Sequence, residues 1–427
     1  MMSQADAPGD RGALEIYDPA AYRDGIPYAT FAALRESTPV SWHEEPALPP
    51  FPTGSGFWAV TRYDDVKHVL RSTDVFSSWL GGTSLPDTRP GELDRVRTML
   101  INQDPPQHAS RRRIISQVFT REALAAHDRF IGEYATQLVA DIREEGAADI
   151  VGRVTDELAL GTLARLLGLP DSDRPLFFRW ANEVAGRRDD EEVDGEIKDH
   201  WPELIAEMFA YADEVAESKR RHPGDDLISA LVHARVDGEA LSADAIHSDF
   251  WLLVVAGNET SRGALPGALM ALMDNPDQLA ALGREPDELL PGAVEECLRY
   301  APPVIRFRRT ATRDTELHGV QIRAHDKVVV FHPAANRDPR AFDDPDAFDI
   351  RRRANNHISF GYGPHACVGA GLARMQLRHV LREAATQLPD LHPTEPPELH
   401  PSNFFFSPIR QPVAWSKSSS PHSRTTA

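Results

Sequence analysis

The sequence predicts a mainly α-helical fold with a minor β region, and three observations support this prediction. Apolar residues recur at helical spacing through most of residues 111–236. Residues 243–274 form a longer helical pattern that contains glycine and proline. Apolar runs that are typical of strands occur at residues 56–60 and within residues 318–331, where a hairpin is expected.

The part of the chain before residue 111 is expected to mix strand, helix and loop. Residues 56–60 are predicted to be a strand and residues 63–70 a helix. Residues 76–100 are rich in Gly, Pro and Ser, and a loop of that length inside a compact domain is usually functional or disordered. The polar segments 1–12 and 416–427 are predicted to be disordered tails. Neither an internal repeat nor a long linker is evident between them.

The composition limits the classes of function. The 427 residues carry a net charge of −19, which argues against nucleic acid or an anionic membrane surface as a general partner. The N-terminal segment lacks an apolar run of signal or anchor length, so we expect a cytoplasmic protein with no membrane anchor. Cys297 and Cys367 form no CxxC pair, so neither a structural zinc site nor an iron–sulfur cluster is predicted.

Cys367 lies in a glycine-rich loop that is the most informative segment of the chain. The run Phe360-Gly361-Tyr362-Gly363-Pro364-His365-Ala366-Cys367-Val368-Gly369 ends where an apolar pattern at helical spacing begins. Backbone N–H groups and a helix N-terminus close to one sulfur favour its anionic form, which is a nucleophile or a metal ligand. The alternative is a buried cysteine in an ordinary glycine-rich turn.

These ten residues resemble the haem-binding loop of the cytochrome P450 family. The resemblance extends over nearly the whole chain and implies one large haem domain at residues 13–415, although length alone suggests two or three domains. It implies haem b buried between the long central helix and the helix after the loop, with Cys367 as the axial thiolate ligand. It also implies that Phe360, Gly361, His365 and Gly369 contact the haem.

Glu296 and Arg299 lie three residues apart on an apolar-striped helical segment, where their side chains can meet. A solvated surface pair is one interpretation. The pair also resembles the family's ExxR element, whose carboxylate takes a second arginine from a later segment, and Arg352 fits that position best. The resemblance implies a buried network beneath the haem loop. The neighbouring Cys297 is expected to be a small core residue.

Residues 104–112 predict the start of a helix. Asp104 is expected to cap it ahead of two prolines, and His108 and Arg112 then lie one turn apart on the same face. A basic helix edge that faces water would explain both residues. They also resemble the family's HxxxR element, which implies contact with the haem propionates, and Arg309 and His365 are implied for the same task.

Glu259 and Thr260 interrupt an apolar run inside the long helical segment. A neighbouring glycine lets a flat ligand approach, and a threonine hydroxyl can bond to the carbonyl four residues earlier, here Ala256. A surface acid beside a capping-type threonine is the alternative. The resemblance is to the family's acid–alcohol pair, which implies that Thr260 steadies oxygen, Glu259 relays protons and Ala256 lies against the haem. Ser261, where a second threonine is common, and Pro266, which can kink a helix, depart from the pattern.

The resemblance implies a haem-thiolate monooxygenase that uses O2 to hydroxylate a bulky hydrophobic substrate. Neither a flavin nor a nicotinamide motif is evident, so a separate ferredoxin and ferredoxin reductase are expected as electron donors. Arg111 and Arg113 are expected to face water as a local basic spot for that donor. Residues 256–262 and 304–319 are similar to actinobacterial members that oxidise sterols and branched lipids. A steroid, terpenoid or branched lipid is therefore expected first, and a polyketide or other secondary metabolite second.

The substrate-pocket positions that the family implies are all apolar, which favours such a substrate, although each of them could belong to the core instead. These positions are Trp79, Leu80, Leu85, Leu100, Leu252, Ala256, Ile305, Phe307, Phe405 and Phe406.

Three other functions are compatible with parts of the pattern. A peroxygenase would use hydrogen peroxide directly, but that branch of the family usually lacks the acid–alcohol pair. A non-catalytic haem sensor or electron carrier would need no proton relay. A cysteine hydrolase would need an acid that orients His365 beside Cys367, and none is evident.

Overall fold

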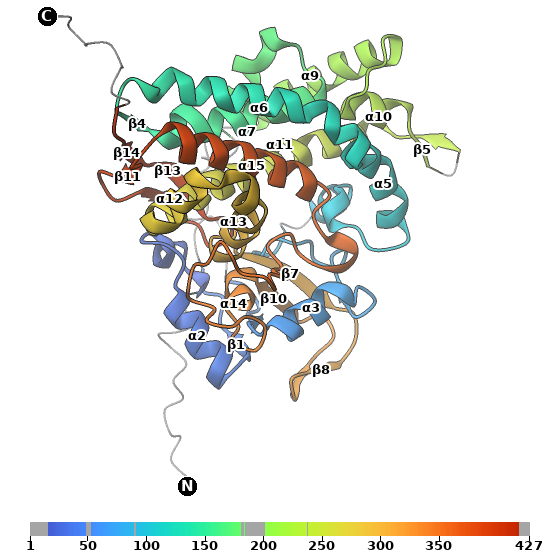
Figure 1. The fold of residues 1–427 in the computed structure, drawn as a ribbon. Coiled ribbons are helices and arrows are strands. Elements are labelled where there is room, and N and C mark those ends of the chain that lie inside the picture. Colours follow the sequence, from blue (N-terminus) through green and yellow to red (C-terminus); the bar gives the residue numbers. More distant parts are fainter. Residues whose placement is uncertain are drawn as a thin grey trace, which may run out of the picture.

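The computed structural model describes residues 16–47, 53–88, 91–180, 183, 201–236 and 238–417. Helices dominate this part of the chain, as the sequence predicts, and the strands form one main sheet, a smaller three-stranded sheet and several two-stranded pairs. Figure 1 shows the long helices in the upper part of the molecule and the main sheet, with its neighbouring short helices, in the lower part.

The helices of the described part are α2 (Tyr28–Ser37), α3 (Tyr63–Arg71), α4 (Leu93–Arg97), α5 (Gln107–Ser116), α6 (Arg121–Arg143), α7 (Asp156–Leu167), α9 (Trp201–Arg221), α10 (Leu227–His233), α11 (Ala243–Met273), α12 (Pro276–Arg284), α13 (Pro286–Tyr300), α14 (His332–Asn336) and α15 (Ala370–Gln387). Short 3₁₀ segments are η1 (Pro19–Tyr22), η2 (Leu100–Asn102), η3 (Gln117–Phe119), η5 (Asp171–Asp173) and η6 (Gly363–His365), and η4 (Val151–Thr155) is a π-helical turn.

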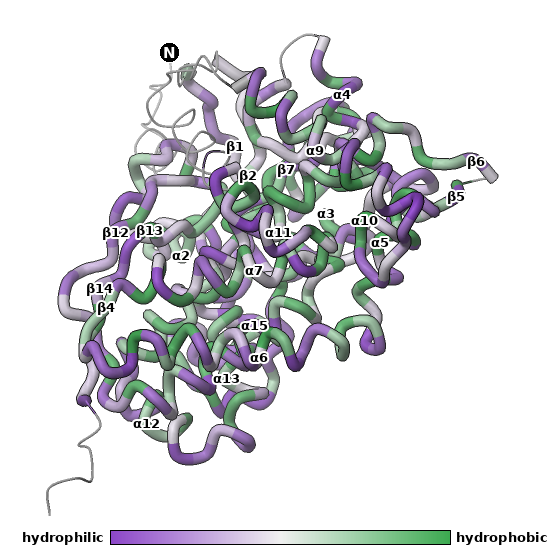
Figure 2. Tube along the Cα trace, turned by 90° about the horizontal axis from the view of Figure 1, so that it is seen from above, coloured by the Kyte–Doolittle hydropathy of each residue, from purple (hydrophilic) through white to green (hydrophobic). Residues whose placement is uncertain are grey.

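α11 is the long central helix that the pattern over residues 243–274 predicts. Ser242 caps its first turn, because its hydroxyl oxygen accepts a hydrogen bond from the backbone N–H of Ala245 at 3.2 Å. Pro266 lies inside the helix without ending it. α11 packs against α7, α13 and α15. Seen from above in Figure 2, α11 and α7 lie in the middle of the molecule. A helix surrounded in this way presents residues to an interior site.

α15 begins directly after the cysteine loop and packs along α6. Thr120 caps α6 by accepting a hydrogen bond from the Ala123 N–H at 3.2 Å. The apolar stripe of α15 includes Leu377, Val380 and Leu381, which are all buried. α15 also contacts α11, and Figure 1 shows these helices side by side. The loop that precedes α15 is thereby held close to the central helix.

The strands are β1 (Val40–His43), β2 (Phe57–Val60), β3 (Phe76–Ser77), β4 (Ala147–Asp149), β5 (Arg235–Val236), β6 (Glu239–Ala240), β7 (Arg306–Ala311), β8 (Thr315–Leu317), β9 (Val320–Ile322), β10 (Lys327–Phe331), β11 (His392–Pro393), β12 (Glu398–His400), β13 (Ser407–Arg410) and β14 (Pro412–Ala414). The main sheet has the order β1-β2-β10-β7-β3. β10 pairs with β2 in parallel and with β7 antiparallel, so it is covered on both edges.

The hairpin expected within residues 318–331 is wrong in position. The hairpin is β8–β9, which turns at His318 and Gly319, and both of these residues have positive φ. β10 belongs to the main sheet instead. Its three consecutive valines are fully buried, and a strand buried on both faces needs partners from elsewhere in the chain.

Other expectations are partly met. The strand expected at residues 56–60 and the helix at 63–70 correspond to β2 and α3. The segment 76–100, expected to be a loop, also contains β3 and α4. The tail expected at residues 1–12 lies outside the described residues, as does all of the second tail except Ser416 and Lys417. In the described part of the chain, no helix has both the length and the apolar character needed to cross a bilayer.

Candidate functional site

An apolar cavity of about 250 Å³ lies between α11 and the cysteine loop. α5 and α7 contribute further walls, and β7 closes one side with Phe307 and Arg309. The cavity therefore joins segments that are more than 200 residues apart in the chain. The lining residues that the sequence points to are Leu100, His108, Arg112, Leu252, Ala256, Thr260, Phe307, Arg309, Phe360, Gly361, His365, Cys367 and Gly369.

The loop holds Cys367 with its accessible surface toward this cavity rather than toward bulk solvent. Its backbone N–H donates to the Phe360 carbonyl oxygen at 2.8 Å. Gly363 has φ of +72°, and a Cβ there would lie 2.9 Å from the Leu70 carbonyl oxygen, so the turn requires glycine. Burial raises the pKa of the Cys367 thiol, while the Gly369 N–H and the Arg112 charge oppose that shift. The site is thus prepared for a partner that stabilises the anionic sulfur.

Basic side chains gather at one side of the cavity, where the Asp104 carboxylate is the acidic group whose charge acts on His108 and Arg309. The rings of His108 and His365 meet in a tilted arrangement with their centroids 4.0 Å apart, and Arg112 donates to the Ala366 carbonyl. Burial lowers the pKa of His108 to about 4 and that of His365 to about 2, and nearby arginines add to both shifts. Both rings are therefore neutral at pH 7, and the positive charge on this side of the cavity comes from the arginines.

Arg309 is as deeply buried as His108. Its guanidinium donates to the Arg308 carbonyl at 2.8 Å, and its Nε has no hydrogen-bond partner. Burial lowers its pKa to about 10. Among the described residues, the carboxylate whose charge acts on Arg309 is Asp104, which already accepts hydrogen bonds from Ser77 and Ser78. A ligand with acidic groups fits this wall, because buried cations need counter-charges. The two carboxylates of a haem meet that requirement.

α11 brings Thr260 to the cavity but turns Glu259 away from the residues that line it. The Thr260 hydroxyl donates to the Ala256 carbonyl at 2.5 Å, and both residues line the cavity. Glu259 is buried and accepts a hydrogen bond from the Asn258 amide at 3.0 Å. Ser261 also lines the cavity, and its hydroxyl donates to Gln376 of α15 at 3.2 Å. Adjacent positions of a helix face different directions, so the Thr260 hydroxyl and the Glu259 carboxylate lie on different sides of α11.

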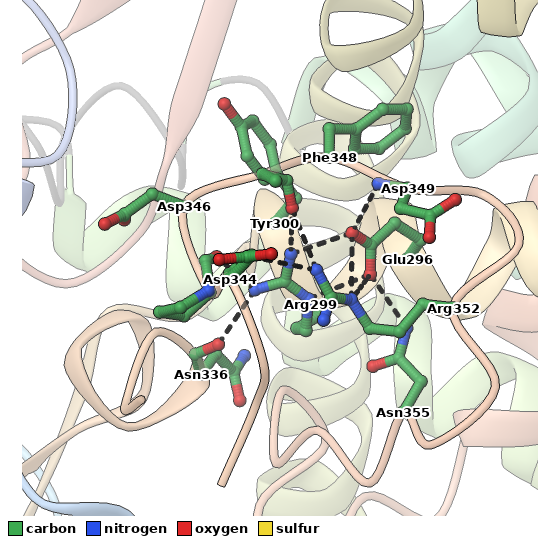
Figure 3. A network of polar contacts seen from close by, with 12 residues as sticks. Glu296, Arg299, Tyr300, Asn336, Asp344, Asp346, Phe348, Asp349, Arg352 and Asn355 are labelled. Carbon is green, nitrogen blue, oxygen red and sulfur yellow. Dashed lines mark hydrogen bonds and ion pairs between the residues drawn. The ribbon is translucent and has the colours of Figure 1, made fainter. Parts of the chain in front are cut away.

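Glu296 lies at the centre of a buried polar network (Figure 3). Arg299 donates to both of its oxygens at 2.8 Å, and the Arg352 Nε donates at 3.1 Å. The Asn355 amide and the backbone N–H of Asp349 donate at 2.9 and 2.8 Å. The surface-pair interpretation is wrong for Glu296 and Arg299, because both side chains are 0% exposed. The adjacent Cys297 is buried, and neither cysteine forms a disulfide.

Two side chains near the start of α5 differ from expectation. Asp104 does not cap the helix: its carboxylate accepts hydrogen bonds from the Ser77 hydroxyl at 2.5 Å and the Ser78 N–H at 2.9 Å. Arg111 does not face water: it is buried and forms an ion pair with Asp249 of α11 at 2.8 Å. Arg113 is exposed, as expected. Both differences arise because a partner from a distant segment outcompetes the local role.

Six of the implied pocket residues do not line the cavity. Leu85 and Ile305 belong to a core cluster with Phe331, and Phe405 packs with Phe404 and Val304. Trp79 is 40% exposed and stacks with Arg97, Leu80 is half-buried outside the cavity, and Phe406 packs against glycines of α11.

Some cavity residues were not anticipated from the sequence. α7 supplies Ala159, Leu163 and Leu166. Their only sequence signal is an ordinary helical apolar stripe, which does not separate a core contact from a ligand contact. Gly257, by contrast, stands where α11 meets α7, and a Cβ there would lie 2.9 Å from Leu163. A glycine inside a helix was therefore a usable signal of close packing.

Comparison with known proteins agrees with this geometry. Residues 191–384 match the model of the cytochrome P450 family. A steroid C26-monooxygenase of Mycobacterium tuberculosis is 39% identical over 390 residues, which cover 90% of this chain and 88% of the relative. A methyl-branched lipid omega-hydroxylase of the same organism is 38% identical over 409 residues, which cover 95% and 94%.

A solved structure shares the whole architecture. It is a Mycobacterium marinum cytochrome P450 in complex with pseudoionone, with a TM-score of 0.87 and 36% identity, covering 96% of this chain and 100% of that one. A helical fold with a cysteine loop opposite a long central helix defines the haem-thiolate class of protein. This chain belongs to the cytochrome P450 family, and it is a monooxygenase with haem b as its cofactor.

Proposed function

We propose that the protein hydroxylates a bulky hydrophobic substrate, and that this substrate is a steroid, a terpenoid or a branched lipid. The observation that carries the proposal is that Cys367 and Thr260 line the same cavity, whose other walls are mostly apolar. The activities of the two mycobacterial relatives, on a steroid and on a methyl-branched lipid, support the same substrate class.

The residues of the cavity fit a haem. We propose that Cys367 binds the iron through its sulfur and that residues 13–415 form one haem domain. His108, Arg112, Arg309 and His365 would hold the carboxylates, since they form the polar side of the cavity. The residues proposed to lie against the porphyrin are Ala256, Phe360, Gly361 and Gly369. When bound, haem supplies the iron centre that activates O2.

Thr260 and Glu259 are the proposed proton-handling residues. The Thr260 proton is held by the Ala256 carbonyl oxygen, so the hydroxyl oxygen keeps free lone pairs for a further donor in the cavity. Glu259 is the proposed source of the proton that replaces one given up by Thr260. Leu252 and Phe307 are apolar walls that limit the entry of water.

Electrons are proposed to come from a separate ferredoxin and its reductase. The sequence contains no flavin or nicotinamide motif that would supply them internally. A net charge of −19 disfavours long-range attraction of an acidic donor, so short-range contacts must dominate the docking. Arg113 is exposed and available for such a contact, whereas Arg111 is committed to Asp249.

The test is the absorption spectrum of the reduced protein with carbon monoxide, followed by a ligand panel. Wild type should show the red-shifted band of a thiolate-ligated haem, and Cys367→Ser should lose both that band and hydroxylation. Sterols, terpenes, branched fatty acids and macrolides are then screened by the shift of the Soret band. Retained hydroxylation in Cys367→Ser would disprove the site, and a response to macrolides alone would disprove the substrate class.

A further inference from the structure

His332 is a fully buried imidazole whose ring nitrogens lack a hydrogen-bond partner among the described residues. Its side chain is 0% exposed, and in the described part of the chain neither Nδ1 nor Nε2 makes a hydrogen bond of normal geometry. A neutral imidazole has one donor and one acceptor, and burying both without partners is unfavourable. Since buried polar groups are nearly always satisfied, an unpaired imidazole in the interior indicates that a partner is supplied from outside the protein.

The sheet places His332 beside the cavity. Its backbone N–H donates to the Ile305 carbonyl at 2.9 Å, which extends the β10–β7 pairing by one residue. Val330 lies opposite Phe307, and side chains two positions apart share a face, so His332 follows Val330 on the face that carries Phe307. The His332 ring meets the Phe307 ring edge-on, with the centroids 5.9 Å apart. Phe307 itself lines the cavity.

Arg309 is the charged neighbour of His332 on this face. The Arg309 charge and, above all, burial lower the pKa of His332 to about 4, so the imidazole is neutral at pH 7. The Val304 carbonyl raises the pKa of His332, but it does not form a hydrogen bond of normal geometry with the ring. The Arg309 Nε is also unpaired. Arg309, which lines the cavity, and His332, which lies behind the Phe307 wall, therefore both carry unsatisfied polar nitrogen atoms.

We propose that His332 is a further cofactor-binding residue, whose ring N–H donates, directly or through one buried water, to the haem carboxylate that Arg309 neutralises. Such a carboxylate satisfies both unpaired groups at once, and a donor to a charged acceptor makes a strong hydrogen bond. A polar group of the substrate is a poorer partner, because the walls near Phe307 are otherwise apolar. The inference rests on the proposed haem site.

The experiment measures the rate at which haem leaves the holoprotein for excess apomyoglobin. His332→Phe keeps an aromatic ring and removes both nitrogens, and we expect haem loss to accelerate about tenfold. His332→Gln retains a donor and should stay within about threefold of wild type. His43→Phe is the matched control, because His43 is also buried and stacks on Phe57, but its ring pairs with Ser41 of β1 and not with Phe307 or Arg309. It should not change the rate.

A second arm uses haem whose carboxylates are esterified. If His332 acts through a carboxylate, wild type and His332→Phe should lose this haem at equal rates. A rate in His332→Phe equal to wild type with ordinary haem would overturn the inference. An equal acceleration with ordinary and esterified haem would also overturn it, because His332 would then be a packing residue. Should His332→Phe not accumulate, His332→Leu takes its place with the same expected outcomes.

The two proposals fail in different ways. Wild-type protein that binds no haem would overturn the proposed function and this inference together. Normal haem binding by wild type with no effect of the His332 variants would overturn this inference alone.

Discussion

Replacing Glu296 by glutamine should destabilise the protein severely, although the two side chains have nearly the same shape. The carboxylate accepts two hydrogen bonds from Arg299 at 2.8 Å and others from Arg352, Asn355 and the Asp349 backbone. The amide lacks the charge and one of the two acceptor oxygens, so two buried guanidinium groups lose their counter-charge. Breaking a buried pair from one side costs about 3–5 kcal/mol. That is a large fraction of a total stability of about 5–15 kcal/mol.

The assay is the urea midpoint of the purified holoprotein, together with its haem content per chain. We expect Glu296→Gln to lower both strongly. The matched control is Glu36→Gln, because Glu36 also accepts two hydrogen bonds from one arginine, Arg340, at 2.9 and 3.2 Å. That pair is exposed, so the control should leave the midpoint unchanged. A midpoint for Glu296→Gln that matches wild type, or equal shifts in both variants, would refute the reasoning.

Three further changes test other parts of the structure. Thr260→Ala should still consume reducing equivalents but release them as hydrogen peroxide, which is measured as product formed per donor oxidised; an unchanged ratio would make Thr260 a packing residue. Gly263→Ala should destabilise by about 1–3 kcal/mol although alanine favours helices, because its Cβ would lie 2.3 Å from the Phe406 carbonyl oxygen; an equal or higher melting temperature would contradict this. Burial raises the pKa of Asp249 from 3.8 to about 6 despite its contact with Arg111. The folded state therefore holds this proton more tightly than the unfolded chain, and the free energy of unfolding should fall as the pH rises from about 4 to about 6. Asp249→Asn should remove that part of the pH dependence, and an identical pH profile in the variant would count against the assignment.

Features that depend on short spacing could be predicted from the sequence. The Thr260 hydroxyl reaches the Ala256 carbonyl because residues four apart lie above one another on a helix. Glu296 and Arg299 meet for the same reason at a spacing of three. The loop around Cys367 is similarly local, since its glycines and the helix that follows determine which way the sulfur faces.

Several features that depend on long-range pairing were not predicted, although the contact of Arg352 with Glu296 that the resemblance implied is present. Arg111 has an ordinary helical neighbourhood, and its partner Asp249 lies 138 residues away in the sequence. Asp104 resembles a helix cap, yet distant serines take its carboxylate. Each of the implied pocket residues is apolar, so the sequence does not separate those that line the cavity from those in the core. The packing of β7, α7 and α11 decides which of them line the cavity.

The amino-acid sequence by itself determined the helical class, the cysteine loop and the local pairs of the central helices, because helical periodicity and turn chemistry act over a few residues. Only the tertiary structure decided which polar groups become buried without partners, as His332 and the Arg309 Nε do, and which apolar residues enclose the cavity. The physical reason is that burial and charge neutralisation depend on segments brought together from distant parts of the chain.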